Sequence, residues 1–562
     1  MVRSRRLVRA RWVVAATCLA LLMAGLVTAR TIRGTVPTAE AAQLAQVARR
    51  PNIVVVMADD MRFDDLQFAP TLRRLASRGV TFRNSFSPFP LCCHARASFL
   101  TGKLAHNHHV YSHLRPYAYG AFDDSRTLAT SLRRSGYRTG FVGKYLNRYG
   151  LDRSKVTGVP SYRYVPRGWT DWFAAFQNPG APGVRGDTYN YMSTPFNVNG
   201  TVRNHVGRYQ TDVVGDYSRR LIERYHGGRG PFFLYVNYLA PHAGGPKEAD
   251  DPRGVRDRRG RLRVVPTPAR RVAVRNRYDD RVDRALGLPR GGGPAEADVS
   301  DKPRFIRHMP EPSSSQRRAE RTLTRQRAQA IYVMDQQIRR TIRTLKRTGE
   351  WSNTYLVFTS DNGYYLGEHR ILHNKARGHE PSLRVPMIIA GPGARDGTSR
   401  YDPITTVDLN RTILDLGRVA PPMTPDGISL LPTLRGGDRG WNRAVPIESA
   451  NGGTPPRTVF QDGDVLRSSG VRTARYSYIR YATGDVELYD LYADPHQNVS
   501  AHADPDLRPI RLLLRQAWDQ MYRCRGAQCQ ALLPEPLRVA PADNRAGTRA
   551  WLAAHARRYG YR

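Results

Sequence analysis

Four short strand-like runs, most of them apolar and rich in β-branched and aromatic residues, constrain the fold of this chain most strongly. They occupy residues 52–57, 137–142, 232–239 and 354–359. Continuous apolar runs of this length are typical of strands that are buried on both faces, as in a parallel sheet covered by helices. A helical pattern over residues 70–79 follows the first run, with Pro at its start and Gly as its stop. The sequence therefore predicts an α/β fold with a large mixed, mostly parallel sheet sandwiched by helices.

Charged, amide and imidazole side chains follow the four runs at the same end. They are Asp59, Asp60, Lys144, His242, Asp361 and Asn362. Because ligands of open α/β sheets bind beyond the carboxyl ends of the strands, we expect these side chains to lie close together. Carboxylate and amide oxygens suit Ca²⁺ or Mg²⁺ rather than Zn²⁺. The sequence therefore predicts a centre in which the aspartates and the asparagine bind a divalent cation.

The second half of the chain continues this pattern and then changes. We predict helices over residues 331–345, 408–416 and 509–522, a buried strand over residues 383–390, and a hairpin of residues 475–481 and 486–491. The helices follow from helical spacing of apolar residues, and the hairpin from alternation on either side of a Thr-Gly-Asp turn. A smaller C-terminal antiparallel sheet with a helix on it is therefore expected.

The first 30 residues have the composition of an export segment. Several arginines precede an apolar run over residues 12–28, and Val27-Thr28-Ala29 resembles a small-residue cleavage site. The run is at the short end of what spans a bilayer, so a cleaved signal peptide and an uncleaved N-terminal membrane anchor both stay open. In either case we expect the folded part to be secreted or extracytoplasmic. In such a compartment we expect Cys524 and Cys529 to form a disulfide, and the alternative is two free buried thiols.

The net charge of +40 raises the local concentration of polyanions around the protein. The sequence contains no zinc-finger, RNP or basic-zipper pattern, so we expect no specific nucleic-acid partner. Sulfated and phosphorylated polymers are the remaining polyanionic partners. Arginines concentrate between residues 253 and 290, inside a stretch, residues 243–325, that loses apolar periodicity. This basic insertion is either a solvated surface segment or a rim that captures an anionic polymer.

The segment that starts at Cys92 resembles the sulfatase signature. That motif reads Cys-x-Pro-Ser-Arg, followed by a short apolar helix start and Thr-Gly-[Arg/Lys]. Cys92 aligns with its cysteine, Arg96 with its arginine, and residues 101–103, Thr-Gly-Lys, with its end. His94 stands where Pro is usual, and Ala95 where Ser is usual. The resemblance implies that Cys92 is oxidised to formylglycine by a formylglycine-generating enzyme.

The resemblance to sulfatases extends from about residue 50 to residue 501, and its motifs are most similar to those of N-acetylglucosamine-6-sulfatases. The matching segments include residues 106–110, 143–150, 298–303, 359–364, 384–386 and 487–491. Their order and spacing make a chance match implausible. The resemblance implies the alkaline-phosphatase-like fold of the family.

Carried over to this sequence, the resemblance implies a chemical role for each residue of the centre. The metal ligands are Asp59, Asp60, Asp361, Asn362 and the formylglycine at position 92. The catalytic set is Cys92, Arg96, Lys144, His242 and Lys375. Hydrated formylglycine attacks sulfur, the arginine holds it, the lysines bind sulfate oxygens, and the histidine protonates or polarises the leaving group.

Further residues are implied to bind the substrate. They are Lys103, His106, His108, His109, Asn147 and His369. Many sulfatases carry His two residues after the lysine that Lys144 matches. Here Leu146 stands at that position, so Asn147 is a candidate replacement for the missing donor.

The leading hypothesis is an exported sulfuric ester hydrolase that acts on the 6-O-sulfate of N-acetylglucosamine or a related sulfated sugar or glycosaminoglycan. One alternative is a catalytically silent protein of this fold that binds anionic glycans, and another is a phosphoester hydrolase of the same superfold. We divide the chain into residues 1–30 (export segment), 31–50 (linker), 51–440 (catalytic domain with the basic insertion), 441–530 (C-terminal subdomain) and 531–562 (basic, poorly ordered tail).

Overall fold

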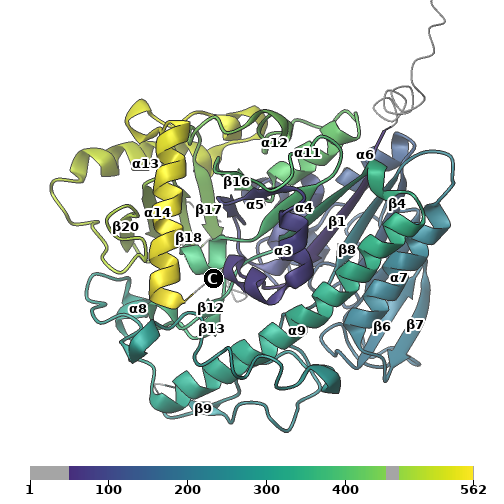
Figure 1. Cartoon of the computed structure of the whole chain (residues 1–562), viewed down its shortest axis with the longest axis horizontal. Helices are drawn as coiled ribbons and strands as arrows, with labels where there is room; N and C mark the ends of the chain where they lie inside the picture. The colour runs from purple at the N-terminus through teal and green to yellow at the C-terminus, as the bar shows by residue number, and fades with distance from the viewer. Residues whose placement is uncertain (1–49, 258, 451–466, 561–562) are drawn as a thin grey trace, which may run out of the picture. The chain divides into compact units, whose positions relative to one another are not determined.

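The computed structural model describes residues 50–257, 259–450 and 467–560, and its centre is a ten-stranded sheet (Figure 1). In spatial order the strands are β15 (Thr398–Arg400), β2 (Val80–Phe82), β14 (Met387–Ala390), β11 (Thr354–Ser360), β1 (Asn52–Ala58), β8 (Phe232–Asn237), β4 (Arg138–Lys144), β5 (Asp171–Ala175), β6 (Ser193–Val198) and β7 (Thr201–Val206). The run from β11 to β5 is parallel throughout, whereas β14, β6 and β7 are antiparallel to their neighbours. The predicted mixed, mostly parallel sheet is therefore confirmed.

Helices cover both faces of this sheet. They are α3 (Pro70–Ala76), α7 (Gln210–Tyr225) and α9 (Ser314–Arg347) on one face, and α4 (Cys92–Thr101), α6 (Leu128–Arg134) and α11 (Asp408–Leu416) on the other. In β1, Val54 and Val56 belong to the first core, while Ile53 and Val55 belong to the second. Alternate residues of a strand point to opposite faces, so a fully apolar strand is what a sheet covered on both sides requires. Figure 1 shows α9 and α7 lying side by side across the sheet.

Short elements connect these layers and carry much of the functional region. They are β3 (Ser85–Phe86), α5 (Ala105–His108), β9 (Val255–Arg256), β10 (Leu262–Arg263), α8 (Arg304–Arg307), β12 (Tyr365–Leu366), β13 (His373–Asn374), α10 (Glu380–Leu383), β16 (Ile404–Thr405) and α12 (Leu431–Gly436). The basic insertion contains β9, β10 and α8, and its predicted end at residue 325 lies inside α9. Tyr278 and Lys302 of the insertion are buried, so part of it packs as core rather than as solvated surface.

The C-terminal subdomain is a four-stranded antiparallel sheet with a helix against it. The strands are β17 (Val445–Ser449), β18 (Ser468–Arg472), β19 (Tyr476–Tyr481) and β20 (Val486–Asp490), and the helix is α13 (Arg508–Arg523). Strands β19 and β20 form the hairpin that alternation predicts. The smaller antiparallel sheet with its helix is therefore confirmed as well.

Two expectations about local structure are wrong. The strand predicted over residues 383–390 is split, because α10 ends at Leu383 and β14 begins only at Met387. Pro386 explains the break, since proline has no backbone N–H to donate to a sheet. The tail beyond residue 531 is also not poorly ordered, because it contains the helix α14 (Pro541–Tyr559).

Helix α14 forms because its buried residues recur at helical spacing. They are Asn544, Thr548, Trp551, His555 and Tyr559, which lie three or four positions apart on one face. Pro541 occupies the first turn, where the missing N–H costs nothing. The arginine- and alanine-rich composition belongs to the other faces of the helix.

The predicted export segment and linker, residues 1–49, lie outside the described residues. Among the residues that the structure describes, no helix combines the length and the apolar character needed to cross a membrane.

Trp551 is the residue through which we expect α14 to stabilise the fold. Its ring lies under the Arg384 guanidinium at 4.2 Å and 5.5 Å from the Phe63 ring, and its Nε1–H donates to the Pro495 carbonyl at 2.8 Å. Trp551→Ala should lower the free energy of unfolding by about 3–5 kcal/mol, because it leaves a cavity and an unpaired carbonyl. Urea unfolding measures the change. The exposed Arg557→Ala is the matched control and should stay within about 0.5 kcal/mol of the wild type; equal effects of the two variants would contradict a packed α14.

Candidate active site

The acidic cluster forms where β1 and β11 end side by side. The two strands pair in register up to Ala58 and Ser360, so the residues that follow them emerge together. The backbone N–H of Asp60 donates to Asp361 Oδ1 at 3.2 Å. The side-chain amide of Asn362 donates to Asp60 Oδ1 at 2.7 Å. Parallel pairing alone thus brings together groups that are some 300 residues apart in the chain.

Cys92 begins α4 and is completely buried against this cluster. Its Sγ lies 3.2 Å from Asp59 Oδ1, 4.0 Å from Asp60 Oδ1 and 2.9 Å from Lys375 Nζ. Burial, and then the charge of Asp59, raise the pKa of the Cys92 thiol well above its usual value. Because the thiolate is the reactive form of cysteine, an unmodified Cys92 is a poor nucleophile at neutral pH.

The guanidinium of Arg96 joins the ends of four strands. Its Nε donates to Asp361 Oδ2 at 2.9 Å and its Nη2 to Asp59 Oδ2 at 3.2 Å. Its Nη1 donates to Asn237 Oδ1 at 2.8 Å and to the Lys144 carbonyl at 3.1 Å. Asn237 was not predicted from the sequence, because the only sign of its role is that it is a polar residue at the end of an apolar strand.

Two lysines and a histidine complete the ring of cationic and imidazole groups. Lys144, the last residue of β4, forms an ion pair with Asp59, and Lys375, just after β13, forms one with Asp60. His242 Nε2 lies 3.7 Å from Asp60 Oδ2, and its Nδ1 lies 2.6 Å from the Ala243 carbonyl. That short contact assigns the proton of a neutral imidazole to Nδ1, so Nε2 faces the centre.

Burial and charge act in opposite directions on the carboxylates. Burial raises the pKa of Asp59 and Asp60, but the neighbouring lysines and His242 outweigh it, so both pKa values are lowered. Burial and the charge of Asp59 raise the pKa of Asp361 to about 6, against the opposing effect of Arg96. Burial lowers the pKa of His242 to about 4, although Asp60 opposes the shift.

The residues of the cluster fit a hard divalent cation. Asn362 Oδ1 is buried and has no hydrogen-bond partner among the described residues. Ligand atoms of Asp59, Asp60, Cys92 and His242 all lie within 4.8 Å of one another. A set of carboxylate oxygens with an unpaired amide oxygen is the kind of donor set that Ca²⁺ or Mg²⁺ binds.

Asn147 and Tyr189 stand on the Lys144 side of the centre. The Asn147 side-chain amide donates to the Tyr189 hydroxyl at 2.7 Å. The Tyr189 ring lies 4.9 Å from Lys144 Nζ and 5.2 Å from the His242 ring. Asn147 was expected at the site, whereas Tyr189 lies in a loop without a recognisable motif and was missed.

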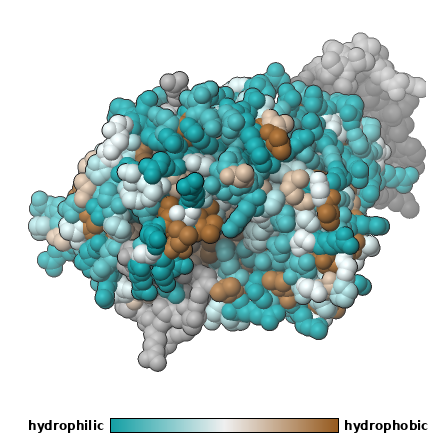
Figure 2. Space-filling view, turned by 90° about the horizontal axis from the view of Figure 1, so that it is seen from below, coloured by the Kyte–Doolittle hydropathy of each residue, from teal (hydrophilic) through white to brown (hydrophobic). Residues whose placement is uncertain are grey.

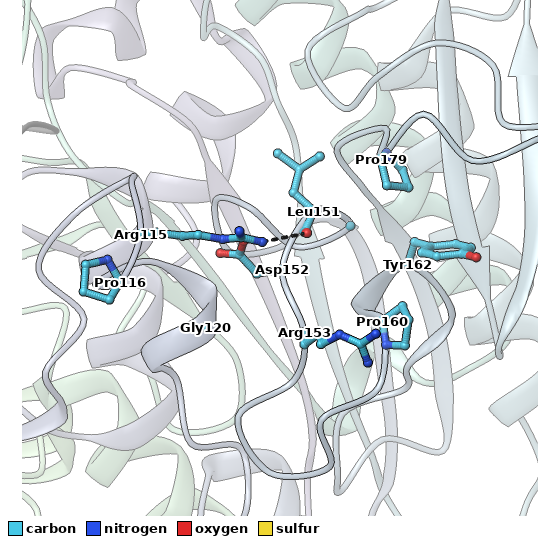
Figure 3. A pocket seen from close by; sticks show the side chains of 10 residues that line it. Arg115, Pro116, Gly120, Leu151, Asp152, Arg153, Pro160, Tyr162 and Pro179 are labelled. Carbon is cyan, nitrogen blue, oxygen red and sulfur yellow. Dashed lines mark hydrogen bonds and ion pairs between the residues drawn. The ribbon is translucent and has the colours of Figure 1, made fainter.

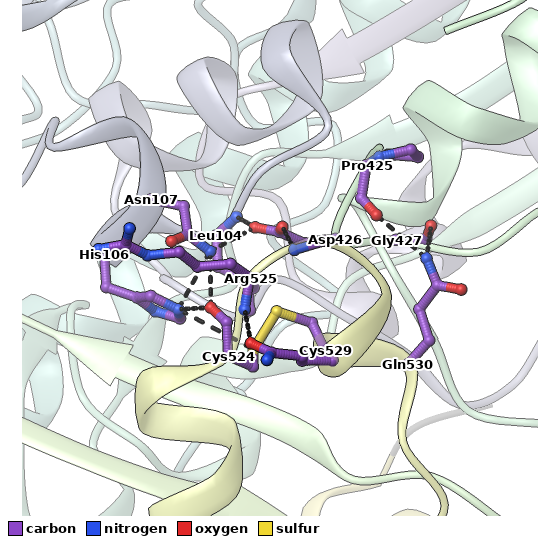
Figure 4. The surroundings of a disulfide bond; sticks show 12 residues. Leu104, His106, Asn107, Pro425, Asp426, Gly427, Cys524, Arg525, Cys529 and Gln530 are labelled. Carbon is purple, nitrogen blue, oxygen red and sulfur yellow. Dashed lines mark hydrogen bonds between the residues drawn. A yellow bond between two sulfur atoms is a disulfide. The ribbon is translucent and has the colours of Figure 1, made fainter. Parts of the chain in front are cut away.

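His106, expected to line the substrate pocket, instead joins the catalytic domain to the C-terminal subdomain (Figure 4). Its Nδ1 contacts the Glu448 carboxylate, and its Nε2 lies 2.8 Å from the carbonyl of Cys524. Cys524 and Cys529 form a disulfide beside this contact. Since both ring nitrogens are occupied by these structural contacts, the geometry does not support a role in substrate binding.

Four more residues that were expected to bind substrate also have other surroundings. His108 is buried, with Nε2 2.9 Å from the Ser98 hydroxyl, and His109 is exposed. Lys103 and His109 line a surface cavity of about 470 Å³ next to the disulfide. His369 is buried, with Nδ1 2.9 Å from Glu296. In the described part of the chain, none of the four is recorded in contact with the Cys92 centre.

A further cavity of about 620 Å³ lies beyond β4 (Figure 3). Arg115 and Asp152 line it, and the two form an ion pair with Nε 2.6 Å from Oδ1. Arg115 also donates to the Leu151 carbonyl at 3.3 Å, and Asp152 accepts from Arg148 as well. The charges of this cavity are therefore largely satisfied within the protein.

The fold and this centre define a hydrolase of sulfuric esters, and comparison with known proteins agrees. The sulfatase family model matches residues 51–419, and the model of the N-sulphoglucosamine sulphohydrolase C-terminal region matches residues 367–523. The chain belongs to the sulfatase family.

Two relatives and one solved structure illustrate the similarity. N-acetylglucosamine-6-sulfatase of Capra hircus is 29% identical in an alignment of 532 residues that covers 86% of this chain and 86% of that protein. The extracellular sulfatase SULF-1 homologue of Drosophila melanogaster is 31% identical over 418 residues, 72% of this chain and 33% of that protein. A solved protein in complex with its substrate D-glucosamine-2-N,6-O-disulfate superposes with a TM-score of 0.61 at 20% identity, covering 86% of this chain and 98% of the other.

The contact between His106 and Glu448 should make stability depend on pH. Burial lowers the pKa of His106, but Glu448 outweighs it and sets the pKa near 9, against 6.5 for an ordinary histidine. A pKa that is raised in the folded state stabilises the protein fully below the unfolded pKa, and this contribution is lost as pH rises through the folded pKa. His106→Gln should therefore destabilise the protein most below pH 6.5 and progressively less up to about pH 9.

Thermal unfolding of the wild type and of His106→Gln across this pH range measures the effect. The exposed His109→Gln is the matched control, because burial and nearby cations lower the pKa of His109 below the window. A difference between wild type and His106→Gln that stays constant with pH would show that the pair is not charged.

Proposed function

We propose that this protein is an exported sulfatase that hydrolyses the 6-O-sulfate of N-acetylglucosamine or of a related sulfated sugar. The observation that carries the proposal is the position of Cys92 Sγ, 3.2 Å from an Asp59 oxygen and 2.9 Å from Lys375 Nζ. An oxygen nucleophile at this position lies between the acidic cluster and a cation that can hold the sulfate. The N-acetylglucosamine-6-sulfatase relatives support the choice of sugar.

The proposal includes a divalent cation bound at this centre and a formylglycine formed from Cys92. Asp59, Asp60, Asp361 and Asn362 would hold Ca²⁺, or Mg²⁺, and residue 92 would be formylglycine. Bound there, the cation supplies positive charge beside the nucleophile, and the hydrated aldehyde supplies the hydroxyl that attacks sulfur. The unpaired Asn362 Oδ1 and the buried carboxylates support this assignment.

The remaining residues bind and orient the sulfate ester. Arg96 fixes Asp59 and Asp361 and so holds the position of the nucleophile. Lys144 and Lys375 bind the non-bridging oxygens, where fixed positive charge stabilises the transition state more than the ground state. His242 presents Nε2 toward the centre. In the neutral ring this nitrogen is an acceptor, so it must first take up a proton before it can protonate the departing sugar oxygen.

Export rests on the N-terminal segment and on the disulfide. Residues 1–30 have the composition of a signal peptide or anchor, and the disulfide between Cys524 and Cys529 suits an oxidising compartment. The Drosophila relative is named as an extracellular sulfatase.

A catalytically silent, glycan-binding protein is the second candidate, and His94 favours it. Its ring is buried and stacks on Phe89, with centroids 3.8 Å apart and an interplanar angle of 6°. His94 occupies the position at which the sulfatase signature, which the modifying enzyme recognises, has Pro. If this side chain prevents oxidation of Cys92, the buried thiol leaves the centre able to bind anions but not to hydrolyse them.

Peptide mass spectrometry distinguishes these two functions. In protein made in its native host, the tryptic peptide of residues 84–96 should show the mass loss expected for conversion of a thiol to an aldehyde. Fragment ions should place the loss on Cys92 and leave Cys93, its neighbour in the same peptide, as the internal control. A peptide with two intact thiols would refute the formylglycine assignment and favour the silent protein.

Removal of divalent cations tests the acidic cluster. Chelation should abolish hydrolysis of an aryl sulfate, because Lys144 and Lys375, which should bind the sulfate, would then stay paired with Asp59 and Asp60. Ca²⁺ should restore the activity, and parallel samples with Mg²⁺ identify the preferred ion. Activity that is indifferent to the chelator would remove the carboxylate cluster from the mechanism.

A further inference from the structure

A cavity of about 460 Å³ lies beside the segment that carries Lys375, since Asn374 and Arg377 both line it. Its lining comes from the basic insertion, from the start of α9 and from residues 370–377, including Asn374, the neighbour of Lys375. Apolar side chains, among them Phe305 and Met309, share this lining with four arginines. Figure 2 views the face on which β9 and α9 lie, and it shows apolar residues gathered around a hollow in a mostly hydrophilic surface.

One arginine of this cavity differs from the others because its charge is not satisfied within the described structure. Arg377 forms no ion pair with the described residues, and its Nε is buried without a hydrogen-bond partner among them. Its guanidinium stacks on the Phe305 ring at 4.1 Å, which fixes its position. Since no carboxylate of the described residues balances this guanidinium, the site favours an anionic ligand that accepts from its terminal N–H groups.

The other arginines of the cavity are occupied. Arg256 donates to the Gly260 carbonyl at 2.7 Å, and Arg263 donates to Asp257 at 2.9 Å. Arg370 donates to the carbonyls of Glu296, Ala297 and Met309 at 2.9–3.1 Å. These contacts hold the insertion together and leave Arg377 as the group available to a ligand.

Arg377 lies close enough to the centre for one molecule to reach both. Only Ala376 lies between it and Lys375, so their Cα atoms are at most about 7 Å apart. The backbone between them is held in place, because the Ala376 N–H donates to the Pro90 carbonyl at 3.1 Å in the loop before Cys92. Lys375 itself contacts Cys92 Sγ.

We propose that Arg377, stacked on Phe305, binds a second anionic group of the substrate while the sulfate to be removed lies at Cys92. This inference rests on the proposed function and narrows its substrate class to sugars that carry a further sulfate or a neighbouring carboxylate. The basic insertion then acts as a specificity element, because it supplies the ring that holds the guanidinium.

Calorimetric binding to Cys92→Ala protein tests the proposal without turnover. The ligands are N-acetylglucosamine-6-sulfate, with one anionic group, and two sugars with a second one: glucosamine sulfated at N and O6, and a uronic acid–N-acetylglucosamine-6-sulfate disaccharide. Arg377→Gln should weaken binding of at least one doubly charged ligand about tenfold and change the singly charged one less than about twofold. The ligand that is affected shows whether sulfate or carboxylate is bound.

Arg263→Gln is the matched control. It removes the same charge from the same cavity, but from an arginine that is already paired with Asp257, so it should leave all three affinities within about twofold. Thermal unfolding of both variants verifies that the fold is intact. Equal weakening of all ligands by Arg377→Gln, or no weakening, would overturn the proposal. Failure of the proposed function is distinguishable, because it appears as absence of turnover in the parent protein while the difference in binding persists.

Discussion

The buried guanidinium of Arg96 is the interaction on which the rest of the centre depends. It connects α4, which carries Cys92, to the ends of β1, β4, β8 and β11. Asp59 and Asp361 are completely buried carboxylates, and removing one partner of such a pair costs about 3–5 kcal/mol. Arg96 stabilises this acidic cluster because one planar cation can donate to several acceptors at once, and Lys144 and Lys375 pair with Asp59 and Asp60. Arg96 thus both positions the helix that carries Cys92 and offsets the negative charge of Asp59 and Asp361.

The convergence of the centre was predictable from the sequence because it follows from strand pairing. Residues after parallel strands emerge at one edge, and the register of Ala58 with Ser360 places Asp59 and Asp361 side by side. Contacts that depend on loop conformation were not predictable. Tyr189 reaches Lys144 from a loop with no periodicity, and nothing in the sequence identifies Asn237 as an acceptor for Arg96.

The errors have equally specific causes. The resemblance to sulfatases implies that His106 binds substrate, but the chain turns away after α4 and the Glu448 carboxylate on β17 binds the ring. The tail was judged from its arginine and alanine content, although the spacing of Trp551, His555 and Tyr559 contains a helical face. The helical period of the tail is present in the sequence, whereas the partner of His106 lies more than 300 residues away and becomes apparent only in the fold.

Net charge and local charge have different consequences in this protein. The overall excess of +40 attracts any polyanion at long range and cannot by itself select one. Selection requires a cation that is held in position, partly desolvated and not already neutralised. Several arginines of the insertion fail the last condition, as the pair of Arg263 with Asp257 shows. Its contribution to specificity is concentrated where Phe305 holds Arg377 against a cavity, two residues from the lysine that faces the nucleophile. A basic segment thus becomes a binding element through one guanidinium that the protein leaves without a partner of its own.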